Sequence, residues 1–257
     1  MTIRKLVKLS SRALVLGTAG CLNLYEVNIE TPIQAKIDVS AFQRVLVAGF
    51  VSGGSKAVDT NAETARLLKS QLRTKSDLKV VDTDVLSLIA EVDRRREAAG
   101  EPAIPDPKSP TELKIKDAND LQAYESIFND TAYWKKVGEE YQSPLIVTGT
   151  ILFTETEKKG EQSTVQPITD SMGRQTYSEV RQMVDKKGFA IVPRFIFIDG
   201  RTGAQLYSET YNQEQLYNST QNTPPLSTYF ELMDKLLPGF LNTLSNQKIK
   251  GTRTLMK

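Results

Sequence analysis

The residue types that carry most catalytic and metal chemistry are scarce in this chain of 257 residues, which holds one cysteine and no histidine. Without histidine, the chain lacks the usual general base near neutral pH, the Ser-His and Cys-His nucleophile pairs and the commonest metal ligand. A single cysteine excludes an intramolecular disulfide. No cluster of Asp, Glu or Cys has metal-ligand spacing. We therefore expect no enzyme, with no catalytic residues, no metal and no cofactor, and a function in binding.

The surroundings of the single cysteine, Cys21, do suggest chemistry. It follows a run of small residues at 18–20 that ends a short apolar stretch over 13–20, and no acidic residue occurs before Glu26. This apolar stretch is far shorter than the roughly 20 residues that span a bilayer. A basic start, a short apolar stretch and a small-residue end are typical of a signal sequence, so we expect residues 1–20 to be a signal peptide.

The segment 18–21 resembles the lipobox of bacterial lipoproteins, in which the cysteine becomes the lipidated first residue of the mature chain. The resemblance implies acylation at Cys21, and several acyl chains hold a protein durably at a membrane. Leu22 stands where enteric bacteria place the Asp that retains lipoproteins in the inner membrane, so the resemblance implies an outer-membrane protein that faces the periplasm. The alternative is a small buried cysteine, which leaves the basic start unexplained.

The charge balance also changes with this interpretation. The whole chain has 33 basic and 31 acidic residues, a formal net charge of +2. Removing residues 1–20 takes away Arg4, Lys5, Lys8 and Arg12, which leaves 29 basic residues against 31 acidic ones, or −2. Neither balance is the electrostatic footprint of a nucleic-acid-binding protein. We therefore expect no nucleic-acid partner.

Three local motifs have structural explanations that fit better than chemical ones. The glycine-rich loop over 49–56 lacks the adjacent Gly-Lys-Ser/Thr of a phosphate-binding loop, because Ser55 precedes its lysine. The arginines at 94–96 lie near a predicted helix end, where cations complement the macrodipole. Trp134, beside Tyr133, has the helical spacing of a core residue, although with the lysines that follow it could form a stacking surface.

Apolar patterning supplies the elements that position these residues. Continuous apolar runs over 44–50 and 145–153 predict strands that are buried on both faces. Further strands are predicted at 78–81, 189–198 and 204–211, with Asp199 in a tight turn between the last two. Helices are predicted at 117–130 and 131–141. Three more helices are predicted from their caps: one begins at Thr60, one at either Asp82 or Thr83, and one at Thr228. Asp82 and Asp84 are therefore interpreted as helix caps and not as a catalytic pair.

Helices and strands alternate in the first half, and a strand meander closed by a helix forms the second. This order predicts an α/β (α+β) fold, a single three-layer domain with a mixed sheet flanked by helices. The expected organisation is a signal peptide at 1–20, a lipidated tether at 21–41 and a domain at 42–247. Within the domain we expect a proline-rich loop at 100–112 and a polar hairpin insertion at 152–187.

Several segments together resemble the α/β domain of a bacterial lipoprotein superfamily. They are the strand 45–50 with its glycine loop, the run 134–140 that leads into the strand 145–150, and the turn 197–203. The superfamily includes the curli-secretion lipoprotein, the penicillin-binding-protein activator lipoproteins and the N-terminal domain of the Tol-system protein. The resemblance spans residues 42–245.

This resemblance implies a non-enzymatic, lipid-anchored periplasmic protein that acts through contacts with envelope proteins, in envelope assembly or maintenance. It also allows the chain to form homo-oligomers. The alternative is an oligomeric outer-membrane secretion component of the curli-secretion type, whose members contribute membrane-crossing hairpins. Such strands need alternating apolar residues that face lipid, whereas the hairpin expected at 152–187 is rich in charge. We therefore expect a soluble hairpin or docking loop. The charged residues are Glu155, Glu157, Lys158, Lys159, Glu161, Asp185, Lys186 and Lys187.

Overall fold

The computed structural model describes residues 24–102, 104 and 113–256. The chain divides into two units, one formed by residues 35–245 and the other by the two chain ends, 1–34 with 246–257. We call the first unit the α/β body and treat the two units separately. The predicted signal peptide, Cys21 and most of the proline-rich loop at 100–112 lie outside the described residues.

A six-stranded mixed sheet runs through the α/β body, in the order β3-β2-β4-β5-β6, with β7 also paired to β5. Strand β2 is parallel to β3 and β4, whereas β4, β6 and β7 are antiparallel to β5. The predicted mixed sheet is therefore confirmed. The strand bounds are β2 Arg44–Gly53, β3 Lys79–Val80, β4 Leu145–Thr169, β5 Gln175–Asp199, β6 Gln205–Thr210 and β7 Gln213–Asn218.

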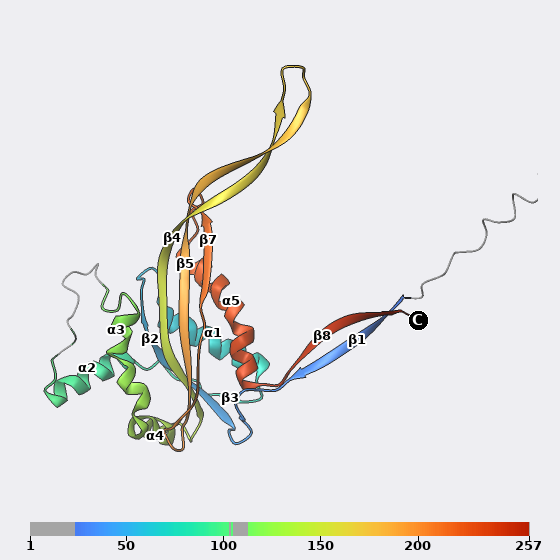
Figure 1. Cartoon of the computed structure of the whole chain (residues 1–257). Helices are drawn as coiled ribbons and strands as arrows, with labels where there is room; N and C mark the ends of the chain where they lie inside the picture. The colour runs from blue at the N-terminus through green and yellow to red at the C-terminus, as the bar shows by residue number, and fades with distance from the viewer. Residues whose placement is uncertain (1–23, 103, 105–112, 257) are drawn as a thin grey trace, which may run out of the picture. The chain divides into compact units, whose positions relative to one another are not determined.

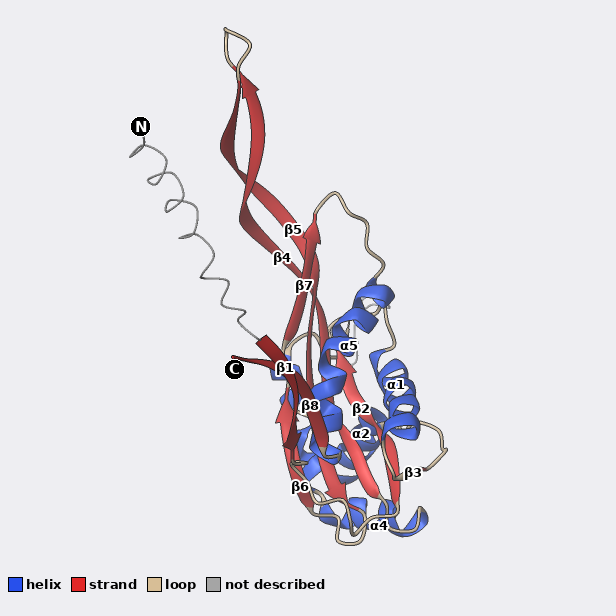
Figure 2. Ribbon diagram, turned by 90° about the vertical axis from the view of Figure 1, so that its right-hand side faces the viewer, coloured by secondary structure: helices blue, strands red, loops and turns tan. Residues whose placement is uncertain are grey.

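Helices cover both faces of this sheet, which confirms the three-layer architecture (Figures 1 and 2). Helices α1 (Thr60–Lys75) and α5 (Pro225–Leu244) pack on one face. The other face carries α2 (Leu88–Ala99), α3 (Ala118–Gln122), the 3-10 helix η1 (Glu125–Asn129) and α4 (Thr131–Glu140).

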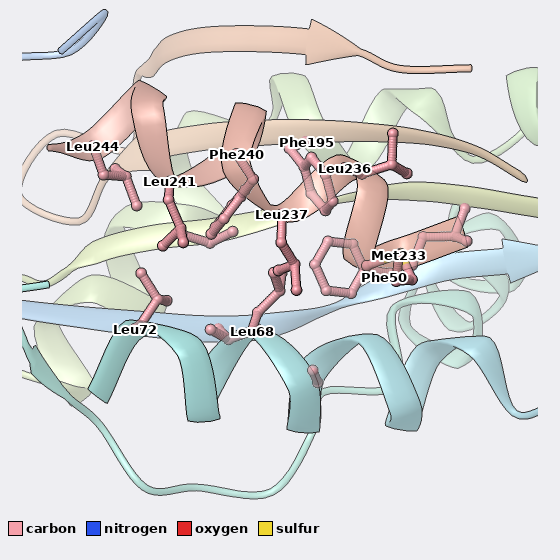
Figure 3. Close-up of a cluster of buried hydrophobic side chains, with 14 of the residues drawn as sticks. Phe50, Leu68, Leu72, Phe195, Met233, Leu236, Leu237, Phe240, Leu241 and Leu244 are labelled. Atoms are coloured by element: carbon pink, nitrogen blue, oxygen red, sulfur yellow. The ribbon is translucent and has the colours of Figure 1, made fainter. Parts of the chain in front are cut away.

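Each face of the sheet has its own hydrophobic cluster, because side chains of successive strand residues point to opposite faces. In β2, Val45 and Val47 join the cluster under α1 and α5, while Leu46 and Ala48 join the other one. Figure 3 shows the first cluster, where Leu68 of α1 faces α5 across the space between the two helices. Burial on both faces accounts for the continuous apolar run in this strand.

Some predicted helix starts are wrong. Asp59 caps α1 in place of Thr60, and its carboxylate accepts a hydrogen bond from the Ala62 N–H at 3.1 Å. Helix α2 begins after Ser87, later than the predicted Asp82 or Thr83. The reason is that residues 81–86 first run along β2, where the Leu86 N–H donates to the Ala48 carbonyl at 2.7 Å.

The C-terminal helix also begins earlier than predicted. Helix α5 starts at Pro225, and its first proline needs no N–H partner at that position. Thr228, the predicted cap, is buried inside the first turn, and its hydroxyl donates to the Pro224 carbonyl at 3.3 Å. By contrast, Gly100 ends α2 in the left-handed region (φ 70°), as the sequence indicates.

The chain ends form a separate antiparallel two-stranded sheet, which we call the terminal ribbon. Strand β1 (Leu24–Ile33) pairs with β8 (Gln247–Met256) in ten register pairs, from Leu24↔Met256 to Ile33↔Gln247. The segment that we expected to be a tether, 21–41, therefore contains a regular strand. Its pairing partner lies more than 200 residues away in sequence, so no local sequence pattern predicts this strand pairing.

Strands β4 and β5 form one long hairpin, which agrees with the hairpin expected at 152–187. They stay paired from Leu145↔Asp199 to Thr169↔Gln175. The neighbouring strands end earlier, since the pairing of β2 stops opposite Leu152 and that of β7 stops opposite Lys186. We call the part beyond these neighbours, residues 160–184, the distal hairpin; Figure 1 shows it in yellow and orange beyond β7.

No helix among the described residues is long and apolar enough to cross a membrane.

Candidate docking surface

The two faces of the distal hairpin differ in charge. Directly paired residues share a face, and side chains alternate along each strand. The even-numbered positions at 160–168 and 176–184 hold no charged residue. The odd-numbered face carries Glu161, Glu179 and Arg181. One face is therefore uncharged and the other mixes charges of both signs.

Large apolar side chains are also exposed on the distal hairpin. Among the described residues, five of the eight exposed large hydrophobic side chains lie here. On the charged face, Val165 is 63%, Tyr177 75% and Met183 72% exposed. Ile168 lies on the uncharged face and Met172 at the tip. Apolar side chains at protein-binding surfaces commonly sit beside polar ones in this way.

Ion pairs and a hydrogen-bonded tip order the distal hairpin. Arg181 lies 3.8 Å from Glu161 across the strands and 3.9 Å from Glu179 on its own strand. At the tip, Asp170 accepts hydrogen bonds from the backbone N–H groups of Arg174 and Met172, both at 2.9 Å. The Arg174 N–H bond contributes most to lowering the pKa of the Asp170 carboxyl. The tip is therefore a defined turn.

A band of four lysines lies at the base of the distal hairpin, where it joins the rest of the α/β body. The cross-strand pairs are Lys158↔Lys186 on one face and Glu157↔Lys187 on the other. Lys187 pairs with Glu157 at 2.8 Å, and this hydrogen bond raises the pKa of Lys187. Lys158 pairs with Glu214 of β7. The four lysines, with Glu157 and Asp185, line a cavity of about 350 Å³.

Two arginines of the run at 94–96 form ion pairs and hydrogen bonds within α2 and with the N-cap of α4. The Arg95 guanidinium donates to Glu91 at 2.7 Å and to Asp130, and lies 4.4 Å from the ring centre of Tyr133. The pKa of Asp130 is held below its usual value, first by the Tyr133 backbone N–H and then by Arg95. Arg94 also pairs with Glu91. These charges are compensated locally.

The remaining sequence candidates also have structural roles. Trp134 is fully buried in the cluster beneath α4, so the core interpretation is confirmed. The end of β2 and the loop after it pack against Ile115: a Cβ at Gly53 would meet the Ile115 side chain at 2.4 Å, and the Gly54 N–H donates to the Ile115 carbonyl at 2.9 Å. Asp199 orders the β5–β6 turn by accepting from the Arg201 backbone N–H at 2.8 Å.

The predicted caps Asp82 and Asp84 do not cap a helix, because they lie in the extended segment before α2. Asp82 instead pairs with Arg73 at 3.1 Å. Within the described residues, no group of three or more His, Cys, Asp or Glu side chains could hold a metal ion. The lipidation candidate Cys21 lies outside the described residues and remains a sequence prediction.

The exposed apolar side chains of the hairpin tip, such as Ile168 and Met172, were not predicted from the sequence. A signal for them was present, because apolar residues recur within an otherwise polar segment that contains no helix pattern. The contact between Arg95 and Tyr133 was not predicted either, since the two residues come from different helices and no sequence spacing links them.

No protein-family model matches this chain, and no curated protein matches it. Among solved structures, the lipoprotein GNA1162 from Neisseria meningitidis is 12% identical, with a match over 77% of this chain and 98% of that chain and a TM-score of 0.33. The hypothetical protein CT253 from Chlamydia trachomatis is 9% identical, with a match over 79% of this chain and 98% of that chain and a TM-score of 0.38. Scores this low do not establish a shared fold.

Proposed function

We propose that this chain is a non-enzymatic, lipid-anchored protein of the bacterial envelope, and that it contacts other envelope proteins through the distal hairpin. The observation that carries the contact proposal is the exposure of Val165, Tyr177 and Met183 on a strand pair beside which the described part of the chain places no third strand. The anchor proposal rests on the lipobox-like segment at 18–21 and the basic residues before it. The sequence resemblance to the lipoprotein superfamily supports both.

The distal hairpin suits docking because both of its outer edges and both of its faces are open to a partner. Open strand edges offer backbone donors and acceptors for strand addition. Exposed tyrosine and methionine side chains supply apolar contact area of the kind enriched at interfaces. Ion pairs such as Arg181 with Glu161 keep the strands in register without covering these side chains. A periplasm-facing orientation at the outer membrane would place this surface among envelope proteins.

If the chain is anchored as proposed, Cys21 should be acylated. Labelled palmitate should enter the wild-type protein in growing bacteria and should not enter a Cys21→Ser variant, because the thiol is the proposed attachment point. Immunoprecipitation followed by gel autoradiography measures the label. A Thr18→Ser variant keeps a small residue at the proposed processing site and serves as the matched control that should still be labelled. Label in both wild type and Cys21→Ser would exclude the anchor at Cys21.

Shortening the distal hairpin should remove partner contacts without unfolding the α/β body. We would replace residues 161–183 by Asn-Gly, a two-residue turn that suits a hairpin between the paired residues Gly160 and Val184. The unfolding midpoint should stay close to wild type, since most of the removed residues are exposed and none that the structure describes is buried. Crosslinking in intact cells followed by mass spectrometry should show the loss of partner crosslinks.

Point substitutions separate the two faces of the distal hairpin. A triple variant, Val165→Ser, Tyr177→Ser and Met183→Ser, removes apolar side chains from the charged face. Its matched control, Ile168→Ser with Val180→Ser, removes apolar side chains from the uncharged face. Loss of crosslinks in the first variant alone assigns docking to the charged face. Unchanged crosslinks in the shortened chain would contradict docking through this hairpin.

The open edges of the distal hairpin also favour a second candidate, the oligomeric secretion component, because copies could pair edge to edge. Neither face of the hairpin offers a continuous apolar band, since Glu161, Glu179 and Arg181 interrupt one and uncharged polar residues dominate the other. A ring of many subunits in detergent extracts would favour this candidate. A monomer after the Cys21→Ser substitution would exclude it.

A further inference from the structure

The terminal ribbon is amphipathic in its register. Strand alternation puts Val27 and Ile29 of β1 on one face, opposite Arg253 and Gly251 of β8. The other face carries Glu26, Asn28 and Glu30, which lie opposite Thr254, Thr252 and Lys250. Ile29 is 39% exposed, and Lys250 forms an ion pair with Glu30 at 3.7 Å. The ribbon therefore has one face with Glu26, Glu30 and Lys250 and another with Val27, the exposed Ile29 and Arg253.

A two-stranded sheet alone is marginally stable in water. The terminal ribbon has ten register pairs and no third strand among the described residues. Its apolar face would gain stability from a surface that takes up Val27 and Ile29. This requirement points to an occupant outside the ribbon itself.

The basic residues near the C-terminus and the short distance from Cys21 to β1 favour a lipid surface as that occupant. The last twelve residues hold Lys248, Lys250, Arg253 and Lys257 and no acidic residue. Lys248 and Lys250 lie on the face of Glu26 and Glu30, so Arg253 is the basic residue that the register places on the apolar face. Clustered basic residues are attracted to anionic lipid headgroups. Cys21 precedes the first residue of β1, Leu24, by three positions, which spans at most about 11 Å. An acyl anchor at Cys21 would therefore hold the start of the ribbon at the bilayer surface.

We infer that the terminal ribbon lies on the membrane surface, with Val27 and Ile29 in the interface and Arg253 at the phosphate groups of anionic phospholipids. Arg253 shares the apolar face, and its aliphatic stem lets the guanidinium reach headgroups while the stem stays in an apolar environment. The opposite face, with Glu26 and Glu30, then points to water. This inference rests on the proposed location at the envelope membrane, and it gives the ribbon a lipid affinity of its own, separate from the acyl anchor at Cys21.

The chain offers a clean test, because a Cys21→Ser background contains no cysteine. Two variants of the chain from position 21 onward, Ile29→Cys and Asn28→Cys, would each carry an environment-sensitive fluorophore on opposite faces of the same strand. Vesicles of phosphatidylglycerol and phosphatidylethanolamine are then added. We expect a blue shift and quenching by brominated lipids for the label at position 29, and neither for the label at position 28. Equal responses at both positions, or no response at either, would overturn the inference.

A second variant tests the charge contribution. Arg253→Gln should weaken binding to the anionic vesicles about fivefold, since one basic residue near such a surface contributes a factor of this size. Vesicles of phosphatidylcholine alone should bind the Cys21→Ser chain equally weakly with and without Arg253→Gln. Unchanged affinity of Arg253→Gln for the anionic vesicles would contradict the role of Arg253. Because the background lacks the thiol, these outcomes are independent of palmitate labelling, so the ribbon and the anchor can fail separately.

Discussion

Replacing Trp134 by alanine should lower the free energy of unfolding by about 3–5 kcal/mol, the usual cost of removing a large aromatic side chain from a core. Trp134 is fully buried in the cluster beneath α4, and its ring meets Tyr133 edge-on at 4.9 Å. Its indole N–H donates to the Ile127 carbonyl at 2.7 Å, which fixes η1 against α4. Because many domains are stable by only about 5–15 kcal/mol, the variant should lose a large part of its stability.

Denaturant unfolding followed by circular dichroism measures this loss, and two controls show its origin. Trp134→Phe keeps most of the apolar volume but removes the donor to Ile127, so it should cost about 1–3 kcal/mol. Tyr177→Ala changes an aromatic residue that is 75% exposed and should stay within about 0.5 kcal/mol of wild type. A Trp134→Ala variant as stable as wild type would restore the alternative that this tryptophan belongs to a binding surface.

The sequence predicts best the elements that are buried on two sides. Strands β2 and the first part of β4 lie between two helix layers, so nearly every residue must be apolar and the runs over 44–50 and 145–153 are unmistakable. The distal hairpin is exposed on both faces, so its alternation is weak and the segment 155–175 looks like a polar loop. The hairpin was expected from the superfamily resemblance, and its charged residues argued only against membrane-crossing strands.

The terminal ribbon could not be predicted, because β1 and β8 come from opposite ends of the chain and neither has a local turn that would identify a partner. Cap positions failed for a different reason. Asp59 and Thr60 are both good cap residues, and the sequence alone does not say which one has its side chain free to accept the Ala62 N–H. Tertiary context, here the packing of buried Thr60 into the body, decides between them.

The candidate docking surface was predictable in part. The superfamily resemblance led us to expect a hairpin at 152–187, and its charges argued against a membrane-crossing one, but the sequence could not show that Val165, Tyr177 and Met183 emerge on one face. That arrangement depends on the pairing register, which is set by the buried end of the hairpin. There, pairs such as Val147↔Phe197 lie in the core, and a slip of one residue would turn these side chains away from it.

Gly138→Ala should destabilise the protein by about 3 kcal/mol, although alanine normally favours a helix over glycine. Gly138 lies inside α4, where it is buried against the β5–β6 turn. A Cβ at this position would meet the Gly200 carbonyl oxygen at 1.8 Å and its carbon at 2.4 Å. These are backbone atoms of a turn that Asp199 and Arg201 hold in place, so they cannot yield as a flexible side chain would.

The clash has to be relieved by moving α4 away from the turn, and this would also loosen the packing of Trp134 on the same helix. Gly160→Ala is the matched control, because the nearest atom to its Cβ would be the Lys186 side chain at an ordinary 3.8 Å. That variant should unfold within about 0.5 kcal/mol of wild type. Thermal unfolding of both variants gives the comparison. If Gly138→Ala were as stable as wild type, α4 would not approach the turn as closely as the structure shows, and the gain in helix propensity would be the larger effect.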